Sequence, residues 1–99
     1  MTLDQLLALD AIVASGTFRA AAERLHKAQS AVSHQIKKLE SELGFRLLSR
    51  DDYRPLLSPV GEVCFREATR VLELVTQLKA VAAGVRGDQE PMISIAISA

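Results

Sequence analysis

The sequence predicts a mainly α-helical fold, in which three short helices and a small β-hairpin precede one long helix. Three observations support this prediction. Apolar residues recur at helical spacing in three segments, with breaks at residues 15–17 and 26–28. The period changes after Gly44, where two short strand-like stretches flank a polar tip. An unbroken helical pattern then starts at Pro59. Helices of this kind followed by a hairpin form a winged helix-turn-helix.

Capping residues mark the ends of the first two helices. Thr2 and Gln5 have the spacing of a capping box at the start of the first helix, and Gly16 follows its last turn. Thr17 is the expected N-cap of a second helix over residues 18–25. The run Ala20-Ala21-Ala22 has no bulky side chain, so a neighbouring helix is expected to approach the second helix closely.

The third helix is expected over residues 29–43, and Gly44 can adopt the left-handed conformation that ends it. Ala28 precedes this helix, so a side-chain N-cap is missing. The arc expected to face the core carries Val32, Ile36, Leu39 and Leu43. The opposite arc carries short polar and basic side chains, namely Ser30, Ser33, His34, Lys37 and Ser41.

The polar arc of the third helix favours insertion into a DNA major groove over an ordinary solvated surface. Its N-terminal half carries short hydrogen-bonding side chains, and the acids lie toward its C-terminal end. The formal net charge of zero argues against a nucleic-acid partner. However, five basic residues between Phe18 and Lys38 stand against Glu23 alone. A local basic surface still attracts phosphate groups.

The hairpin is expected from strands at residues 45–49 and 54–58, with Pro55 confining one of them to an edge. The long helix is expected to begin at Pro59 and to carry apolar residues in a 3.5-residue repeat. Such a stripe predicts pairing with a second copy of the chain, although burial against a missing domain is the alternative. The predicted dimerisation residues are Cys64, Ala68, Val71, Leu72, Val75, Leu78 and Ala82.

These elements predict three parts: a DNA-binding domain over residues 1–58, a linker and dimerisation helix over 59–86, and a hinge with one strand over 87–99. The strand, residues 92–98, is expected to open a further domain, because a lone strand is not stable in water. The sequence has no apolar run of membrane-spanning length, and its one cysteine fits a reducing cytoplasm. No metal-ligand spacing joins His26, His34 and Cys64, so neither an enzyme nor a cofactor or metal site is expected.

The order and spacing of several motifs resemble the N-terminal DNA-binding domain of the LysR-type transcriptional regulators. The resemblance covers residues 3–98, and its motifs are Ser15-Gly16-Thr17-Phe18, Ala20-Ala21-Ala22, Leu25-His26, Gln29-Ser30-Ala31-Val32-Ser33, Ile36, Leu39-Glu40, Leu43-Gly44, Leu47, Arg50, Leu57-Ser58 and Gly61. It implies a bacterial, cytoplasmic regulator that binds partly palindromic promoter DNA. It also implies a homodimer formed through antiparallel linker helices, or a tetramer in the full-length protein. A small-molecule effector would bind only the C-terminal domain.

The resemblance also implies roles for individual residues. The residues expected to face the major groove are Gln29, Ser30, Ser33, His34 and Lys37. Backbone phosphates are expected to meet Thr17, Phe18 and Arg19, with Lys27 and Lys38 as further positioning contacts. Arg50 and Arg54 are assigned to the wing near the minor groove, although the wing-tip acids Asp51 and Asp52 would repel phosphate.

A different function remains open at this stage, because the same fold can dock a protein through its third helix. The net charge of zero and the acidic wing tip support this alternative. It predicts binding that does not respond to salt or to DNA. The DNA-binding hypothesis instead predicts an affinity that falls steeply with salt, since phosphate contacts release counterions.

Overall fold

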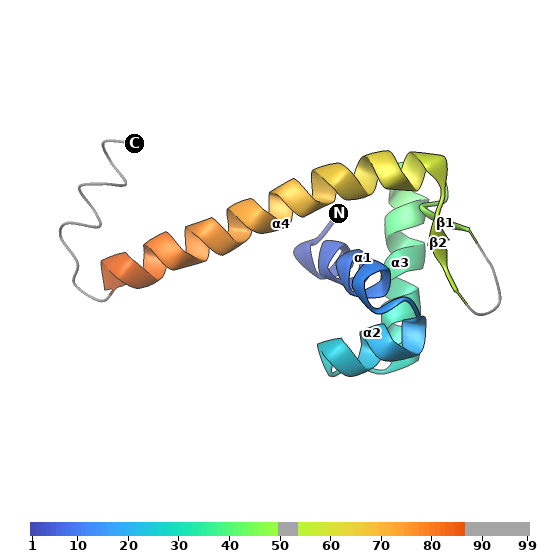
Figure 1. Ribbon diagram of the computed structural model, residues 1–99, viewed down its shortest axis with the longest axis horizontal. Coiled ribbons are helices and arrows are strands. Elements are labelled where there is room, and N and C mark those ends of the chain that lie inside the picture. The colour runs from blue at the N-terminus through green and yellow to red at the C-terminus, as the bar shows by residue number, and fades with distance from the viewer. Residues whose placement is uncertain (50–53, 87–99) are drawn as a thin grey trace. The chain divides into compact units, whose positions relative to one another are not determined.

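A computed structural model describes residues 1–49 and 54–86, and the helices and strands within them follow the predicted order (Figure 1). Three short helices come first, two strands follow, and one long helix completes the described part of the chain. The elements are α1 (Leu3–Ser15), α2 (Phe18–Leu25), α3 (Gln29–Leu43), β1 (Leu48–Ser49), β2 (Leu56–Leu57) and α4 (Pro59–Arg86). The predicted strand at residues 92–98 lies outside the described residues.

The predicted caps of α1 and α2 are present. The Thr2 hydroxyl accepts a hydrogen bond from the Gln5 amide at 3.2 Å, and the Gln5 side chain accepts one from the Thr2 amide at 3.0 Å. Gly16 ends α1 with a φ of 87°. The Thr17 hydroxyl then accepts a hydrogen bond from the Ala20 amide at 3.0 Å. These reciprocal bonds satisfy amides that a helix start leaves without partners.

Helix α3 begins without a side-chain cap and ends at a left-handed glycine, as predicted. Ala28 makes no side-chain hydrogen bond, although its carbonyl accepts from the amides of Ala31 and Val32. Gly44 has a φ of 87°, and its amide donates to the Glu40 carbonyl at 2.9 Å. The turn at its C-terminal end sends the chain into the wing.

The core of the compact unit Met1–Thr69 is aliphatic. Helices α1, α2 and α3 pack against one another around it (Figure 1). Helix α2 contributes the small residues Ala21 and Ala22, both buried, so its neighbours can approach closely. The largest fully buried side chains are Leu9, Ile12, Leu39, Leu47 and Val32. The buried Leu47 extends this core from the helices to the wing.

The strands of the wing are shorter than predicted, with two residues each where five were expected. They pair antiparallel, with Leu48 opposite Leu57 and Ser49 opposite Leu56. Pro55 has no amide proton to donate, which limits the ladder on one side. On the other side, the Ser58 amide donates to the Leu47 carbonyl at 2.8 Å.

Helix α4 starts where the wing ends, at Pro59, with Ser58 as its cap. The Ser58 hydroxyl accepts a hydrogen bond from the Gly61 amide at 2.9 Å and donates one to the Arg46 carbonyl at 2.7 Å. The first residues of α4 belong to the compact unit that ends at Thr69. From Arg70 to Arg86 the described chain is one helix. Of the helices in the described ranges, none is long and apolar enough to cross a membrane.

Candidate nucleic-acid interface

The predicted amphipathic character of α3 is present in the structure. Val32, Ile36 and Leu39 are buried in the core, with 0%, 3% and 1% of their surfaces exposed. Of the residues predicted to read DNA, Ser30, Ser33, His34 and Lys37 lie away from this buried arc at roughly 100° per residue. Ser33 is half-buried and the other three are exposed. Gln29 is also exposed, but it is the first residue of the helix and lies close to the stripe of Val32 and Ile36. The helix therefore presents short polar and basic side chains to a partner.

A tight turn fixes α2 against α3. The turn spans residues 26–28, the length found in helix-turn-helix motifs. His26 ends α2 in the left-handed region with a φ of 57°, a conformation that few residues other than glycine adopt. The Lys27 amide donates to the Ala22 carbonyl at 2.9 Å. Because these bonds hold the turn, the N-termini of both helices keep a fixed relation.

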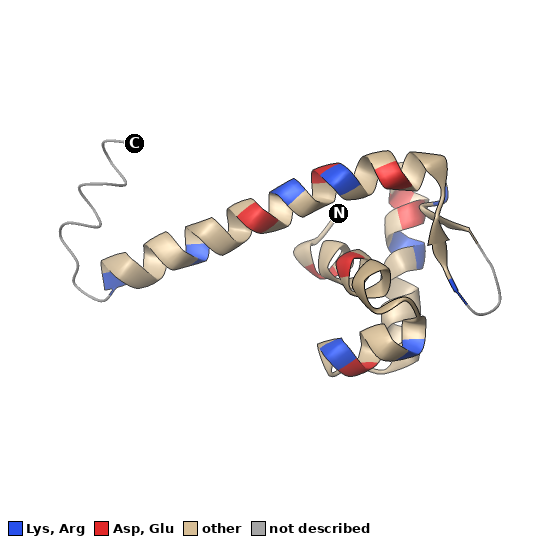
Figure 2. Cartoon of the chain, in the orientation of Figure 1, with Lys and Arg blue, Asp and Glu red and all other residues tan. Residues whose placement is uncertain are grey.

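The residues expected to contact phosphate on α2 are placed at its N-terminus. Thr17 caps the helix and Phe18 is half-buried. The Arg19 side chain is 83% exposed, and its guanidinium lies 3.9 Å from the Glu23 carboxylate one turn later. An exposed ion pair of this kind is weak, so Arg19 can exchange it for a phosphate group. Figure 2 shows the basic residues of α2 and α3 in blue and their acidic residues in red.

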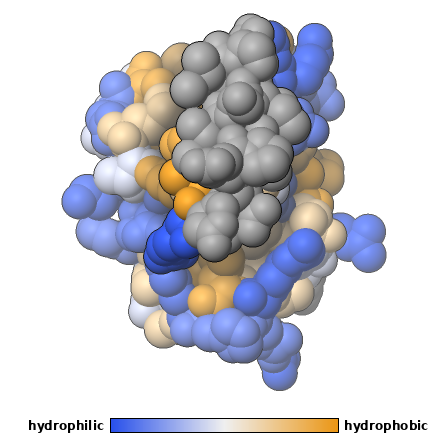
Figure 3. All heavy atoms as spheres, turned by 90° about the vertical axis from the view of Figure 1, so that its left-hand side faces the viewer, coloured by the Kyte–Doolittle hydropathy of each residue, from blue (hydrophilic) through white to orange (hydrophobic). Residues whose placement is uncertain are grey.

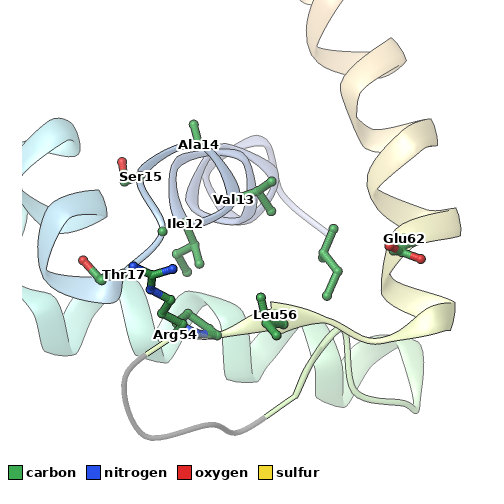
Figure 4. A pocket seen from close by; sticks show the side chains of 11 residues that line it. Ile12, Val13, Ala14, Ser15, Thr17, Arg54, Leu56 and Glu62 are labelled. Atoms are coloured by element: carbon green, nitrogen blue, oxygen red, sulfur yellow. The ribbon is translucent and has the colours of Figure 1, made fainter.

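The structure brings Thr17 together with the wing. An open hollow of about 700 Å³ lies between the end of α1 and the start of β2. Thr17 and Arg54 both line it, and the Arg54 side chain extends from the wing toward Thr17 (Figure 4). Thr17, predicted to meet a backbone phosphate, and Arg54, predicted to lie in the wing near the minor groove, therefore line one hollow. Arg50, Asp51 and Asp52 lie outside the described residues.

A second, smaller cavity of about 80 Å³ lies between α3 and the wing. Ser33 and Lys37 line it from α3, and Phe18 lines it from α2. Ser49 and Pro55 close it from the wing. Three of the predicted DNA-contacting residues therefore lie together at the junction of the three elements.

Two predicted positioning contacts lie apart from this group. Lys27 is exposed in the turn before α3. Lys38 is also exposed, but it follows Ser33 by five residues and so lies about 140° around the helix at roughly 100° per residue. Neither lines the cavity that holds Ser33. Across the described part of the chain, no group of three or more His, Cys, Asp or Glu side chains is placed to hold a metal ion.

The predicted dimerisation residues differ in exposure. Ala68 is only 6% exposed and Cys64 is half-buried, so the chain itself covers part of this end of the stripe. Val71 and Leu78 are 43% and 67% exposed, Ala82 is exposed, and Leu72 and Val75 are intermediate. Apolar side chains are also visible among hydrophilic ones at the surface in Figure 3.

Sequence reasoning gave too little weight to two residues that matter for these surfaces. The sequence places Leu74 among the residues that widen the apolar stripe of the long helix, but not among the predicted dimerisation residues. It is 63% exposed, and it follows Val71 by three residues and precedes Leu78 by four. Glu40 was noted only as part of a motif, yet its carboxylate accepts hydrogen bonds from the amides of Leu47 and Leu48. A signal was present in the sequence, because Glu40 is an acid on the same helical stripe as Ser33 and Lys37.

Comparison with known proteins identifies the family. Residues 3–62 match the model for the bacterial regulatory helix-turn-helix proteins of the lysR family. The chain is 44% identical over 73 residues to a "Probable RuBisCO transcriptional regulator" of Chlorokybus atmophyticus, covering 74% of this chain and 23% of the relative. It is 41% identical over 75 residues to the transcriptional regulator MetR of Salmonella typhimurium, covering 76% and 24%. The chain thus spans about a quarter of these relatives.

Solved structures of DNA complexes also match. The DNA-binding domain of CbnR bound to DNA matches with a TM-score of 0.79 and 31% identity, over 87% of this chain and 99% of that one. The DNA-binding domain of BenM bound to its catB site 1 DNA matches with a TM-score of 0.83 and 31% identity, over 91% and 97%. From the family model, these relatives and the shared fold, we conclude that the chain belongs to the LysR family of bacterial regulatory helix-turn-helix proteins.

Proposed function

We propose that this chain is the sequence-reading part of a transcriptional regulator and inserts α3 into the DNA major groove. The observation that carries this proposal is the polar face of α3, which is held outward by a buried opposite face. The similarity to two DNA-binding domains crystallised with DNA supports it. We assign the reading to residues 1–58 and the linking of two such domains to the helix over residues 59–86.

The chemistry of the exposed side chains suggests how sequence is read. The Gln29 amide can bond N7 and N6 of adenine together, and Lys37 can reach guanine or a phosphate. The Ser30 and Ser33 hydroxyls can bond either a base or a phosphate. His34 offers a ring nitrogen where it faces the groove. These residues would supply the specificity of the complex.

A second set of residues would position the domain on the phosphate backbone. Thr17, Phe18 and Arg19 present the N-terminus of α2, which attracts phosphate through its amides and its dipole. Lys27 and Lys38 flank α3 and add contacts that carry no sequence information. Arg54 would extend the contact surface from the wing, together with Arg50.

We infer that two copies of the chain bind one site. Beyond Arg70, the large apolar side chains exposed on α4 form a stripe with spacings of three, four and seven residues: Val71, Leu74, Leu78 and Val85. A second copy of α4 is the partner that this spacing fits, and two reading heads at a fixed separation would favour a partly palindromic site. Because α3 lacks a side-chain cap, a single DNA-binding domain is expected to bind DNA weakly, and pairing of two domains would strengthen the binding. Tetramers and a small-molecule effector would involve chain beyond these residues.

An electrophoretic mobility shift assay at two or more salt concentrations tests the function. Promoter fragments serve as probes, and the observed affinity should fall steeply, with a slope of about −0.9 per phosphate contact on a double-logarithmic plot. Lys37→Ala should reduce the slope by about one contact. Lys79→Ala removes an exposed lysine from α4 and serves as the matched control. An affinity that does not change with salt would favour the protein-docking alternative.

A further inference from the structure

We propose that Glu40 is a positioning residue, which fixes the wing against the DNA-reading helix through its carboxylate without itself contacting DNA. One oxygen of this carboxylate accepts hydrogen bonds from the Leu47 amide at 2.9 Å and from the Leu48 amide at 3.2 Å. Leu48 is the first residue of β1, so the carboxylate ties α3 directly to the start of the wing. The inference rests on the proposed DNA-binding function, because it explains how the wing is placed for DNA.

The two amides have no access to an alternative partner in water. Leu47 is completely buried and Leu48 is 3% exposed. A buried amide without an acceptor is strongly disfavoured, and a charged acceptor forms the stronger kind of hydrogen bond. Glu40 therefore determines which conformation the segment after α3 adopts.

Glu40 lies in the last turn of α3, next to the point where the helix ends at Gly44. Its backbone carbonyl accepts the Gly44 amide at 2.9 Å, a bond that any residue at this position could make. Its side chain holds the chain seven and eight residues further on. The carboxylate is therefore the part of Glu40 that fixes the direction in which the wing leaves.

The remaining sides of the same segment are held by α4. The Leu47 carbonyl accepts the Ser58 amide at 2.8 Å, and the Ser58 hydroxyl donates to the Arg46 carbonyl at 2.7 Å. The Gly61 backbone lies so close that an added Cβ would be 2.1 Å from the Leu47 carbonyl oxygen. Leu47 and Leu48 are therefore enclosed, and among the hydrogen bonds of the described residues the Glu40 carboxylate is the side chain of α3 that holds them.

The location of Glu40 on α3 connects this contact to DNA reading. Glu40 follows Ser33 by seven residues and Lys37 by three, so all three share one helical stripe. The same three residues line the small cavity that Ser49 and Pro55 close from the wing. An acid on a face that approaches phosphate would be unfavourable unless it served another role. Accepting two amides from the wing is that role.

Two conservative variants test the inference without removing the side chain. Glu40→Gln keeps an oxygen at the same reach, and one oxygen accepts both bonds in the structure. Glu40→Asp keeps the charge but shortens the reach by one methylene. Glu42→Asp is the matched control, because Glu42 lies on the same helix and pairs only with the amino terminus of Met1 among the contacts found for it.

The first readout is amide hydrogen exchange of the free chain. In Glu40→Asp we expect exchange at Leu47 and Leu48 to accelerate by about tenfold or more, as the loss of a bond to a charged acceptor implies. Exchange in α1 and α2 should be unchanged. Glu42→Asp should exchange like the parent chain. Glu40→Gln keeps an acceptor at the same reach but loses the charge, so its exchange should be faster than in the parent chain and slower than in Glu40→Asp. Unchanged protection in Glu40→Asp, or a loss in Glu40→Gln as large as in Glu40→Asp, would overturn the inference whether or not the chain binds DNA.

The second readout is hydroxyl-radical footprinting on a duplex enriched from a random pool by the parent chain. Glu40→Asp should lose protection of the backbone flanking the major-groove contact, where the wing lies, and keep the central protection. Glu40→Gln should keep both. An Asp variant that retains the flanking protection would overturn the inference, whereas failure of the parent chain to enrich any duplex would overturn the proposed function.

Discussion

Replacing Gly61 by alanine should destabilise the compact unit strongly, although alanine is the better helix former. Gly61 lies in the first turn of α4, with an ordinary helical backbone. An added Cβ would meet the Leu47 backbone at 2.1 Å from its oxygen, 2.9 Å from its carbonyl carbon and 3.1 Å from its Cα. All three atoms are main chain, so no side-chain rotation can relieve the clash.

The size of the effect follows from two opposing contributions. An extra methyl group in a well-packed interior lowers the free energy of unfolding by about 1–3 kcal/mol. Because the obstacle at Gly61 is main chain, we take the upper value, about 3 kcal/mol. Alanine regains up to about 1 kcal/mol of helix propensity relative to glycine. The net loss is about 2 kcal/mol. For a domain of this size it lowers the thermal midpoint by roughly 8–16 °C.

The assay is thermal unfolding followed by circular dichroism at 222 nm, with urea unfolding as a check on the free energy. Gly84→Ala is the control, because it makes the same change in the same helix outside the compact unit. By helix propensity it should leave the midpoint unchanged or slightly higher. A Gly61→Ala variant as stable as the parent would refute the close approach of α4 to Leu47.

Three further predictions concern the reading head and the pairing helix. Ala28→Ser should stabilise the domain by about 0.5–1 kcal/mol in urea unfolding, toward the lower end because the Ala31 amide already bonds the Ala28 carbonyl; no gain would mean that the hydroxyl finds no amide. Gln29→Ala should weaken specific DNA binding by about 1–3 kcal/mol in mobility shifts and spare random DNA, and equal losses on both would argue against direct readout. Leu78→Glu should dissociate the dimer in sedimentation, because this 67% exposed side chain lies on the proposed pairing stripe. Thr76→Glu adds the same charge on the other side of α4, and the same dissociation there would place the interface elsewhere.

Local signals made the helices of this chain predictable. A cap depends on a residue and the amide three positions later, as at Thr17 and Ala20, so the sequence contains the whole interaction. The left-handed glycine at residue 44 and the missing cap at residue 28 are equally local. The apolar arc of α3 was predictable because helical periodicity reports directly which side is buried. These features appear in the structure where they were predicted, except that Leu43, the last residue of the apolar arc, is only half-buried.

The wing was predicted less well, because its geometry depends on contacts between distant residues. The strand-like composition of residues 45–49 indicated a longer strand than the two residues that pair. Phe45 and Arg46 instead form part of the connection between α3 and β1. This connection is fixed by the Glu40 carboxylate, which accepts the Leu47 amide, and by the Ser58 hydroxyl, which donates to the Arg46 carbonyl. No pattern of single-residue preferences specifies such a pairing across 7 and 12 positions.

The pairing face of α4 shows a similar limit. A 3.5-residue repeat fits more than one register on a helix rich in Val, Leu and Ala, and the sequence alone favoured the register that includes Cys64 and Ala68. Burial separates the alternatives, since Ala68 is 6% exposed and Leu74 is 63% exposed. The proposed pairing stripe is therefore centred on Leu74 and Leu78.

The zero net charge of the chain is compatible with DNA binding because several acidic side chains interact with donors of the chain itself. Near the reading face, Glu40 accepts two amides, Glu42 pairs with the amino terminus, and Glu23 lies within reach of Arg19. The Glu40 and Glu42 carboxylates face donors of the chain itself, which reduces their repulsion of phosphate, whereas Glu23 is shielded only while Arg19 keeps its weak ion pair. Net charge sets long-range steering, whereas the local arrangement of charges sets the contact energy. We therefore expect the chain to associate with DNA slowly and in a salt-sensitive manner. Placement of the wing by Glu40 and pairing through α4 would then supply binding energy that the overall charge does not supply.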